Sequence, residues 1–227
     1  MKYIIMCGGE YPHFEQPRQL LRFMGEPLVA RTIRLLHENG IIDIAISATD
    51  DRFKGFGVPV LEHDNFYVGR AYNDADGDWC NCFYPMDEPA CYLFGDVCFS
   101  PEAIRTIVET DTDDIAFFAS APPYPPEYVK IWEEPFAFKV QNQEHLKQAV
   151  ADVKRLTREG RFNREPIAWE VWNVISRGAG ADVDVNTIDY HSYVRINDWT
   201  NDIDKPDEIG LLETMARRAG YSPYVEK

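Results

Sequence analysis

The segment KYIIMCGG, residues 2–9, decides the fold class of this chain. Its first five residues are mostly apolar and predict a buried strand, which the glycines then end in a loop. Beyond the loop, Pro27 begins a helix that runs to Gly40, and residues 41–48 form a second apolar run. A strand, a helix and a second strand in this order predict parallel pairing with a right-handed crossover.

The same alternation continues along the chain and predicts an α/β fold with a central, mostly parallel sheet. We expect further strands at residues 58–61, 90–94, 115–120, 136–140 and 193–196, and further helices at 101–109, 144–158 and 206–219. The proline-rich run at residues 121–126 interrupts the pattern. We therefore predict a single domain over residues 1–227, in which residues 121–180 are an insertion packed on the sheet.

Composition excludes several classes of protein. The 227 residues carry 38 acidic and 23 basic side chains, a formal net charge of −15, which disfavours a general nucleic-acid binder. No apolar run approaches the roughly 18 residues of a membrane span, and we see no secretory signal pattern. The 5 cysteines lack the spacing of a zinc site, so we expect reduced thiols in a cytoplasmic protein.

Polar loops follow three of the predicted strands, at residues 7–18, 95–99 and 197–205. In an open α/β sheet, ligands bind outside the carboxyl ends of the strands. We therefore expect these three loops to form one ligand site.

The loops contain the groups that a magnesium-bound triphosphate requires. Gly8 and Gly9 offer backbone amides that can approach phosphates, and Arg18 adds a cation. The carboxylates are Asp96, Asp202 and Asp204. Mg²⁺ is typically held by one or two carboxylates together with substrate oxygens. Separately, each feature has a simpler interpretation, as a tight turn for the glycines and as a cap of the last helix for the two later aspartates.

Three motifs, in the same order, resemble those of the nucleotidyltransferases that activate sugar phosphates or alcohol phosphates. The first is IIMCGG at residues 4–9, followed by PRQLL at 17–21 and GEPLV at 25–29. The second is LFGDVCF at residues 93–99, and the third is DIDKPDEI at residues 202–209. Together the motifs span nearly the whole chain, whereas its middle third matches no motif of the family.

This resemblance implies a Rossmann-like, glycosyltransferase-A-like fold and a reaction that joins a nucleoside triphosphate to a phosphorylated acceptor, releasing pyrophosphate. It places Arg18 on the acceptor phosphate or the α-phosphate. The nucleotide-binding residues implied are Cys7, Gly8 and Gly9, and the Mg²⁺ ligands are Asp96, Asp204 and Asp202. His13 is either a partial substitute for an arginine of the family at the nucleotide or a surface loop residue. Small relatives with a similar closing motif favour CTP, with a sugar phosphate, an amino-alcohol phosphate or a phosphonate as acceptor.

The chain departs from the family pattern in its first loop. Tyr11 and His13 stand where the family has a glycine and an arginine. In the predicted insertion, Lys130 and Glu134 either face the acceptor or lie on a solvated strand. Trp169 and Trp172 are expected in the core or at a homodimer contact.

Two alternatives follow. A glycosyltransferase of the same fold would use a nucleotide-sugar, but it is expected to have Asp-x-Asp where this chain has Phe94 and Asp96. A nucleotide-binding relative without turnover is the other alternative, because the first loop has changed.

Overall fold

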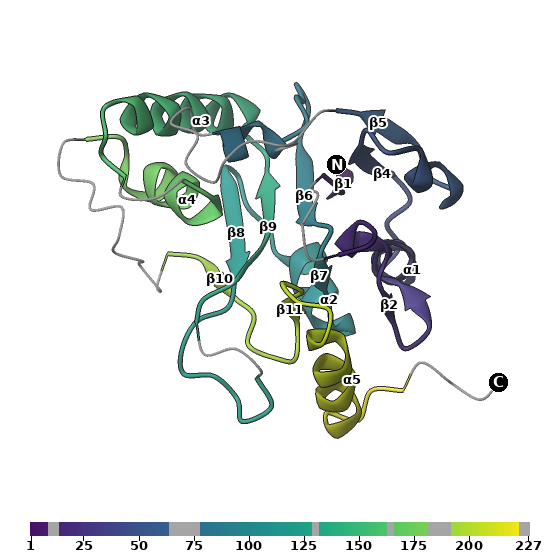
Figure 1. Ribbon diagram of the computed structural model, residues 1–227. Coiled ribbons are helices and arrows are strands. Elements are labelled where there is room, and N and C mark those ends of the chain that lie inside the picture. Colours follow the sequence, from purple (N-terminus) through teal and green to yellow (C-terminus); the bar gives the residue numbers. More distant parts are fainter. Residues whose placement is uncertain (9–13, 64–77, 129–131, 163–165, 181–191, 223–227) are drawn as a thin grey trace.

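The structure is a computed structural model that describes residues 1–8, 14–63, 78–128, 132–162, 166–180 and 192–222. In these residues, a 7-stranded sheet has the order β10-β8-β9-β6-β1-β4-β5 (Figure 1). Its strands are β1 (Lys2–Met6), β4 (Ile44–Ala48), β5 (Val60–Glu62), β6 (Ala90–Phe94), β8 (Ile115–Ala119), β9 (Pro135–Val140) and β10 (Val194–Arg195). The predicted α/β fold with a mostly parallel sheet is confirmed.

One strand runs against the others. β1 pairs in parallel with β4 and β6, β4 with β5, and β8 with β10, whereas β9 pairs antiparallel with both β6 and β8. β9 lies inside the region 121–180 that we predicted as an insertion, yet it is an interior strand of the sheet. The parts of this region outside the sheet are the segment before β9 and the helices after it.

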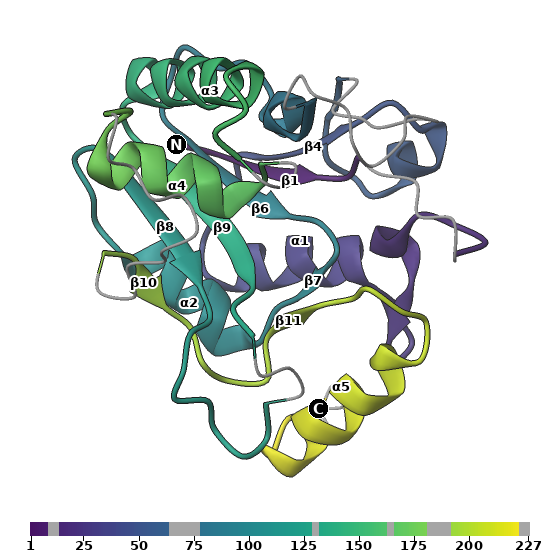
Figure 2. The ribbon, with the colours of Figure 1, turned by 60° about the vertical axis from the view of Figure 1, so that its left-hand side comes forward.

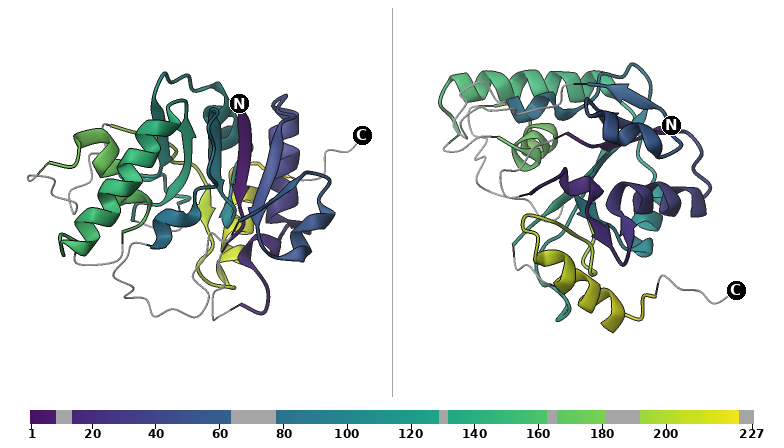
Figure 3. Two further views of the ribbon diagram at one scale, coloured as in Figure 1. Left: turned by 90° about the horizontal axis from the view of Figure 1, so that it is seen from above. Right: turned by 45° about the vertical axis from the view of Figure 1, so that its right-hand side comes forward.

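Helices cover both faces of the sheet, as the turned views show (Figures 2 and 3). On one face lie α1 (Leu28–Glu38) and α2 (Pro101–Glu109), and on the other lie α3 (Gln143–Arg158) and α4 (Ala168–Arg177). Ser100 caps α2 as its sequence position predicts, because its hydroxyl accepts a hydrogen bond from the amide of Ala103 at 2.9 Å. None of the helices in the described residues is long and apolar enough to span a bilayer.

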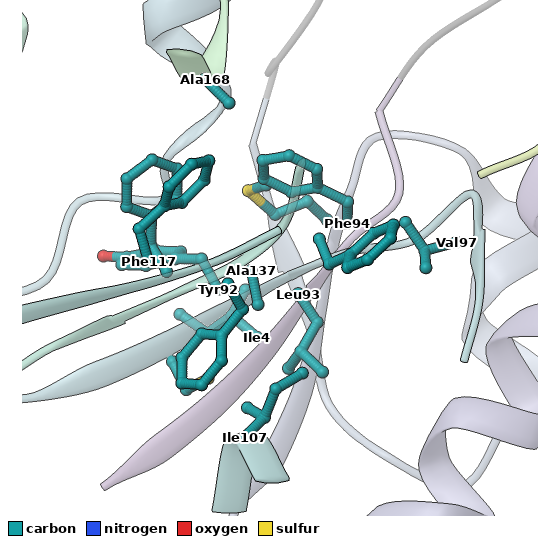
Figure 4. Packing of buried hydrophobic residues seen from close by; sticks show 14 of the residues in the cluster. Ile4, Tyr92, Leu93, Phe94, Val97, Ile107, Phe117, Ala137 and Ala168 are labelled. Atoms are coloured by element: carbon teal, nitrogen blue, oxygen red, sulfur yellow. The ribbon is translucent and has the colours of Figure 1, made fainter. Parts of the chain in front are cut away.

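The main core fills both sides of the sheet. Leu93 of β6 and Ile107 of α2 lie on one side, and Phe117 of β8 lies on the other (Figure 4). Phe117 packs against Trp169 and Trp172 of α4, with ring centroids 5.2 and 5.4 Å apart. Both tryptophans are buried within the chain, so they serve its core.

A second, smaller core lies below the carboxyl end of the sheet, where α5 (Glu208–Arg218) packs. It joins this helix to two short antiparallel ribbons, β2 (Arg22–Phe23) with β3 (Glu26–Pro27), and β7 (Val97–Cys98) with β11 (Asn201–Asp202). Its buried residues are Phe23, Leu28, Cys98, Trp199, Ile203, Leu212, Met215 and Ala216. The β7–β11 ribbon forms within the loops 95–99 and 197–205, and β2 begins shortly after the loop 7–18.

Candidate functional site

The ends of β1 and β6 come together so closely that only glycine fits between them. Met6 pairs with Phe94, and the amide of Gly95 donates to the Met6 carbonyl at 3.1 Å. A Cβ atom at Gly95 would lie 2.5 Å from the Met6 oxygen and 2.9 Å from Cγ of Gln19. Gly95 therefore allows the loop that carries Asp96 to lie directly beside the loop that begins at Cys7.

The ribbon of β7 and β11 brings the closing motif to the same place. Asp202 pairs with Val97, the residue that follows Asp96, across this antiparallel ribbon. Residues more than 100 positions apart in the sequence thereby become neighbours. Glu208 then holds the loop after β11, since its carboxylate accepts hydrogen bonds from the amides of Asp204 at 2.7 Å and Lys205 at 3.0 Å.

Arg18 connects the two carboxylate loops. It begins the short 3-10 helix η1 (Arg18–Leu20), and its side chain is 12% exposed. Its Nη2 lies 2.5 Å from Oδ2 of Asp96, and its Nη1 lies 3.3 Å from Oδ1 of Asp204. Nη1 also donates to the carbonyl of Ile203 at 2.9 Å. The guanidinium thus contacts two of the three carboxylates that the sequence analysis named as Mg²⁺ ligands.

Glu134 completes an acidic group with Asp202 and Asp204. One carboxylate oxygen from each of the three lies within 4.8 Å of the others. Glu134 is 8% exposed, and its backbone amide donates to the Ser120 hydroxyl at 2.8 Å. The sequence analysis paired Asp96 with Asp202 and Asp204 as metal ligands, whereas the structure groups these two with Glu134 and pairs Asp96 with Arg18.

The direction of β9 explains why Glu134 lies here. Glu134 immediately precedes β9, and an antiparallel strand begins at the edge of the sheet where its parallel neighbours end. The sequence shows an acidic residue before an apolar run, but not that the run is antiparallel. If β9 were parallel to its neighbours, Glu134 would lie at the opposite edge of the sheet. Because β9 is antiparallel, Glu134 lies near Asp202.

The first loop is only partly described. Gly8 accepts a hydrogen bond through its carbonyl from Nε2 of the buried Gln19 at 3.0 Å. Burial raises the pKa of the Cys7 thiol well above its usual range, and the nearby Asp96 charge adds to this. The predicted site residues Gly9, His13 and Lys130 lie outside the described residues, as does Tyr11.

Aromatic side chains that the sequence analysis did not assign to the site adjoin its acidic group. The indole nitrogen of Trp132 donates to Oε1 of Glu134, and 53% of Trp132 is exposed. Tyr124 and Tyr128 stack with ring centroids 4.7 Å apart. Burial raises the pKa of the Tyr128 hydroxyl, and the charges of Glu134 and Asp202 raise it further. In the sequence, the signal for these aromatic side chains was Tyr124 in the proline-rich run and Tyr128 just after it.

No family model matches the chain, and no curated protein matches it. Solved structures do match along nearly its whole length. A protein assigned as a glucose-1-phosphate thymidylyltransferase from Bacillus anthracis, in complex with sucrose, is 17% identical with a TM-score of 0.58, and the match covers 97% of each chain. The inositol-1-phosphate CTP transferase of T. maritima is 16% identical with a TM-score of 0.52, over 95% of this chain and 96% of that one.

A third match is the CMP:2-keto-3-deoxy-manno-octonic acid synthetase in complex with CTP. It is 12% identical with a TM-score of 0.50, over 96% of this chain and 100% of that chain. This chain has the nucleotidyltransferase fold. The predicted resemblance in fold is thereby confirmed.

Proposed function

We propose that this protein is a Mg²⁺-dependent nucleotidyltransferase that joins a nucleoside triphosphate to a small phosphorylated acceptor and releases pyrophosphate. The observation that carries the proposal is the contact of Arg18 with both Asp96 and Asp204, while the adjacent Gln19 bonds to Gly8. These groups lie beyond the carboxyl ends of β1 and β6, where open α/β sheets bind ligands. The shared fold supports the same reaction class.

The side chains present fit a hard divalent cation. Glu134, Asp202 and Asp204 offer only carboxylate oxygens, which suit Mg²⁺ better than thiolate or imidazole ligands would. Asp204 joins this group to Arg18 and Asp96, and a divalent cation bound there would balance negative charge of the carboxylates. Bound there, the metal would neutralise charge on the triphosphate.

The reaction would need no protein nucleophile. An oxygen of the acceptor phosphate attacks the α-phosphorus, the bond to the bridging oxygen breaks, and pyrophosphate leaves with that electron pair. Arg18 would hold the acceptor phosphate or the α-phosphate, and the amide of Gly8 would approach the phosphates. Catalysis of this kind is positioning and stabilisation of charge. The protonated, buried thiol of Cys7 is consistent with this direct transfer.

We further propose CTP as the nucleotide and a sugar phosphate, amino-alcohol phosphate or phosphonate as the acceptor. Two of the similar structures are a CTP transferase and a synthetase bound to CTP, which supports this choice. Tyr124, Tyr128 and Trp132, whose rings adjoin the acidic group, are proposed to contact the acceptor. Lys130 and Glu134 are proposed to contact it as well.

The proposal is tested by pyrophosphate release with each of the four nucleoside triphosphates and a panel of phosphorylated acceptors, with and without Mg²⁺. We expect release that needs an acceptor, is fastest with CTP and stops with EDTA. Sugar transfer from a nucleotide-sugar without pyrophosphate release would favour a glycosyltransferase instead. Nucleotide binding without turnover on any acceptor would favour the inactive relative.

A further inference from the structure

A charged side chain, Arg31, is buried in the second core. Arg31 lies on α1 and is 2% exposed. Its Nε and Nη2 donate to the carbonyl of Phe99 at 3.3 and 3.0 Å, and its Nη1 donates to the hydroxyl of Tyr221. Among the residues that the structure describes, no carboxylate lies within ion-pair distance of Arg31. Burying such a cation is costly unless specific groups compensate for its lost hydration.

Three aromatic rings surround the guanidinium and supply part of that compensation. Its central carbon lies 4.6 Å from the ring centroid of Tyr221, 5.0 Å from that of Phe23 and 5.5 Å from that of Trp199. Phe23 and Trp199 also stack on one another at 5.5 Å. The negative face of an aromatic ring attracts a cation, and the attraction is larger away from water.

Three of the four partners of Arg31 come from the segments that carry the site, and the fourth, Tyr221, follows α5. Phe23 lies five positions after Arg18, Phe99 lies three positions after Asp96, and Trp199 lies three positions before Asp202. Each anchor therefore lies only three to five residues along the chain from its site residue. A single side chain on a rigid helix therefore contacts all three segments.

We propose that Arg31 is a positioning residue, which sets the spacing between Arg18, Asp96 and Asp202 by holding Phe23, Phe99 and Trp199 around one guanidinium. The role rests on the proposed function of the site, because it concerns the metal and phosphate geometry. A planar guanidinium can donate to a carbonyl and a hydroxyl while stacking on rings, whereas an ammonium group cannot do all three. An apolar side chain would fill the space without fixing the direction of any partner.

The test compares Arg31→Lys, Arg31→Met and Tyr221→Phe with the parent protein, at a temperature well below all of their melting points. Binding of Mn²⁺ alone is measured by electron paramagnetic resonance, kcat and KM by pyrophosphate release, and local order by hydrogen exchange of peptides that contain residues 96–99 and 199–204. We expect Mn²⁺ affinity to fall about fivefold or more in Arg31→Met, and kcat to fall at least about tenfold, since small misplacements are costly in catalysis. The Mn²⁺ affinity and kcat of Arg31→Lys and of Tyr221→Phe are expected to lie between those of Arg31→Met and the parent.

Lys139→Met is the matched control. Lys139 is also a buried cation, 6% exposed, and its Nζ donates to the carbonyls of Ile107, Val108 and Thr110 at the end of α2. We expect this variant to lower the melting temperature but to leave Mn²⁺ affinity, kcat and exchange at residues 199–204 unchanged. The comparison separates positioning from a general loss of stability.

Two outcomes would overturn the proposal. The first is parent-like Mn²⁺ affinity, kcat and exchange in the folded Arg31 variants. The second is a Tyr221→Phe or Arg31→Lys protein that has a lower melting temperature than the parent but the same Mn²⁺ affinity, kcat and exchange at residues 199–204, as expected of Lys139→Met. This result also decides the case if Arg31→Met does not fold. If the parent itself shows no transfer, the proposed function fails, whereas the Mn²⁺ and exchange measurements still test Arg31.

Discussion

Arg18 places a positive charge next to the acidic group that is proposed to bind the metal ion. Its guanidinium contacts Asp96 and Asp204, and Asp204 also belongs to the acidic group with Glu134 and Asp202. A positive charge beside a metal site weakens metal binding, because like charges a few ångströms apart repel strongly in a partly buried site. The same charge is needed for the phosphates, so metal affinity and turnover depend on Arg18 in opposite ways.

We therefore predict that Arg18→Met binds Mn²⁺ more tightly than the parent, by about fivefold to fiftyfold. The transfer reaction should fall by about tenfold to a hundredfold in kcat/KM, because a charge-assisted phosphate contact is lost. Arg18→Lys should recover much of the transfer rate. Arg22→Met removes an equal charge from an exposed neighbour and is the control for net charge. Weaker Mn²⁺ binding in Arg18→Met would contradict this account.

Asp96→Asn tests the second carboxylate loop. The amide is nearly isosteric, so the fold should persist, but it lacks the negative charge that faces Arg18 and that we propose for binding the metal. We expect kcat for pyrophosphate release to fall by about tenfold to a thousandfold at limiting Mg²⁺. Asp87→Asn, on an exposed side chain that pairs with Lys147, should retain the parent rate. An Asp96→Asn protein as fast as the Asp87→Asn protein would remove Asp96 from the site.

At the scale of elements, the contact between the ends of β1 and β6 decides whether the site can form. Gly95→Ala would place a methyl group 2.5 Å from the backbone oxygen of Met6, and backbone cannot move aside as a flexible side chain can. We expect the free energy of unfolding to fall by about 1–3 kcal/mol or more, measured by urea denaturation.

Gly210→Ala is the matched control for that substitution. Gly210 lies in α5 with nothing within 4 Å of the added methyl group, and alanine favours helix. This variant should gain about 0.5–1 kcal/mol. A Gly95→Ala protein as stable as the parent would show that β1 and β6 do not meet as closely as described.

At the scale of the whole molecule, buried thiols should lower the free energy of unfolding as the pH becomes alkaline. Burial raises the pKa of Cys91 and of Cys98 from the ordinary thiol value of 9.0 to about 12. Because the folded pKa lies above the unfolded one, the stabilisation is complete below about pH 9 and is lost as pH rises toward 12. At pH 10 each thiol should cost the folded state on the order of 1 kcal/mol relative to neutral pH.

Urea denaturation at pH 7.5 and pH 10 measures this loss. Cys91→Ala and Cys98→Ala should each depend less steeply on pH than the parent, whatever their stability at pH 7.5. Equal dependence in the parent and in both variants would show that these thiols do not ionise differently on unfolding.

Local sequence determined most elements of this protein. The apolar run at residues 2–6 and the serine before residue 101 identify β1 and the start of α2, because strand burial and helix capping depend on near neighbours. The position of Gly8, Arg18 and Asp96 in loops at one edge of the sheet was also predictable, because these loops follow parallel strands, which end at the same edge. These inferences need no knowledge of which strands are adjacent.

Tertiary structure decided what the local pattern leaves open. The antiparallel direction of β9 places Glu134 beside Asp202, and the pairing of β7 with β11 places Asp202 beside Asp96. In the sequence, nothing distinguishes Arg31 from the other polar residues of α1. In the structure, the rings of residues 23, 199 and 221 enclose it. Such contacts depend on strand order and long-range packing, which no short stretch of sequence encodes, because the free energy that favours them arises only when distant segments bury one another.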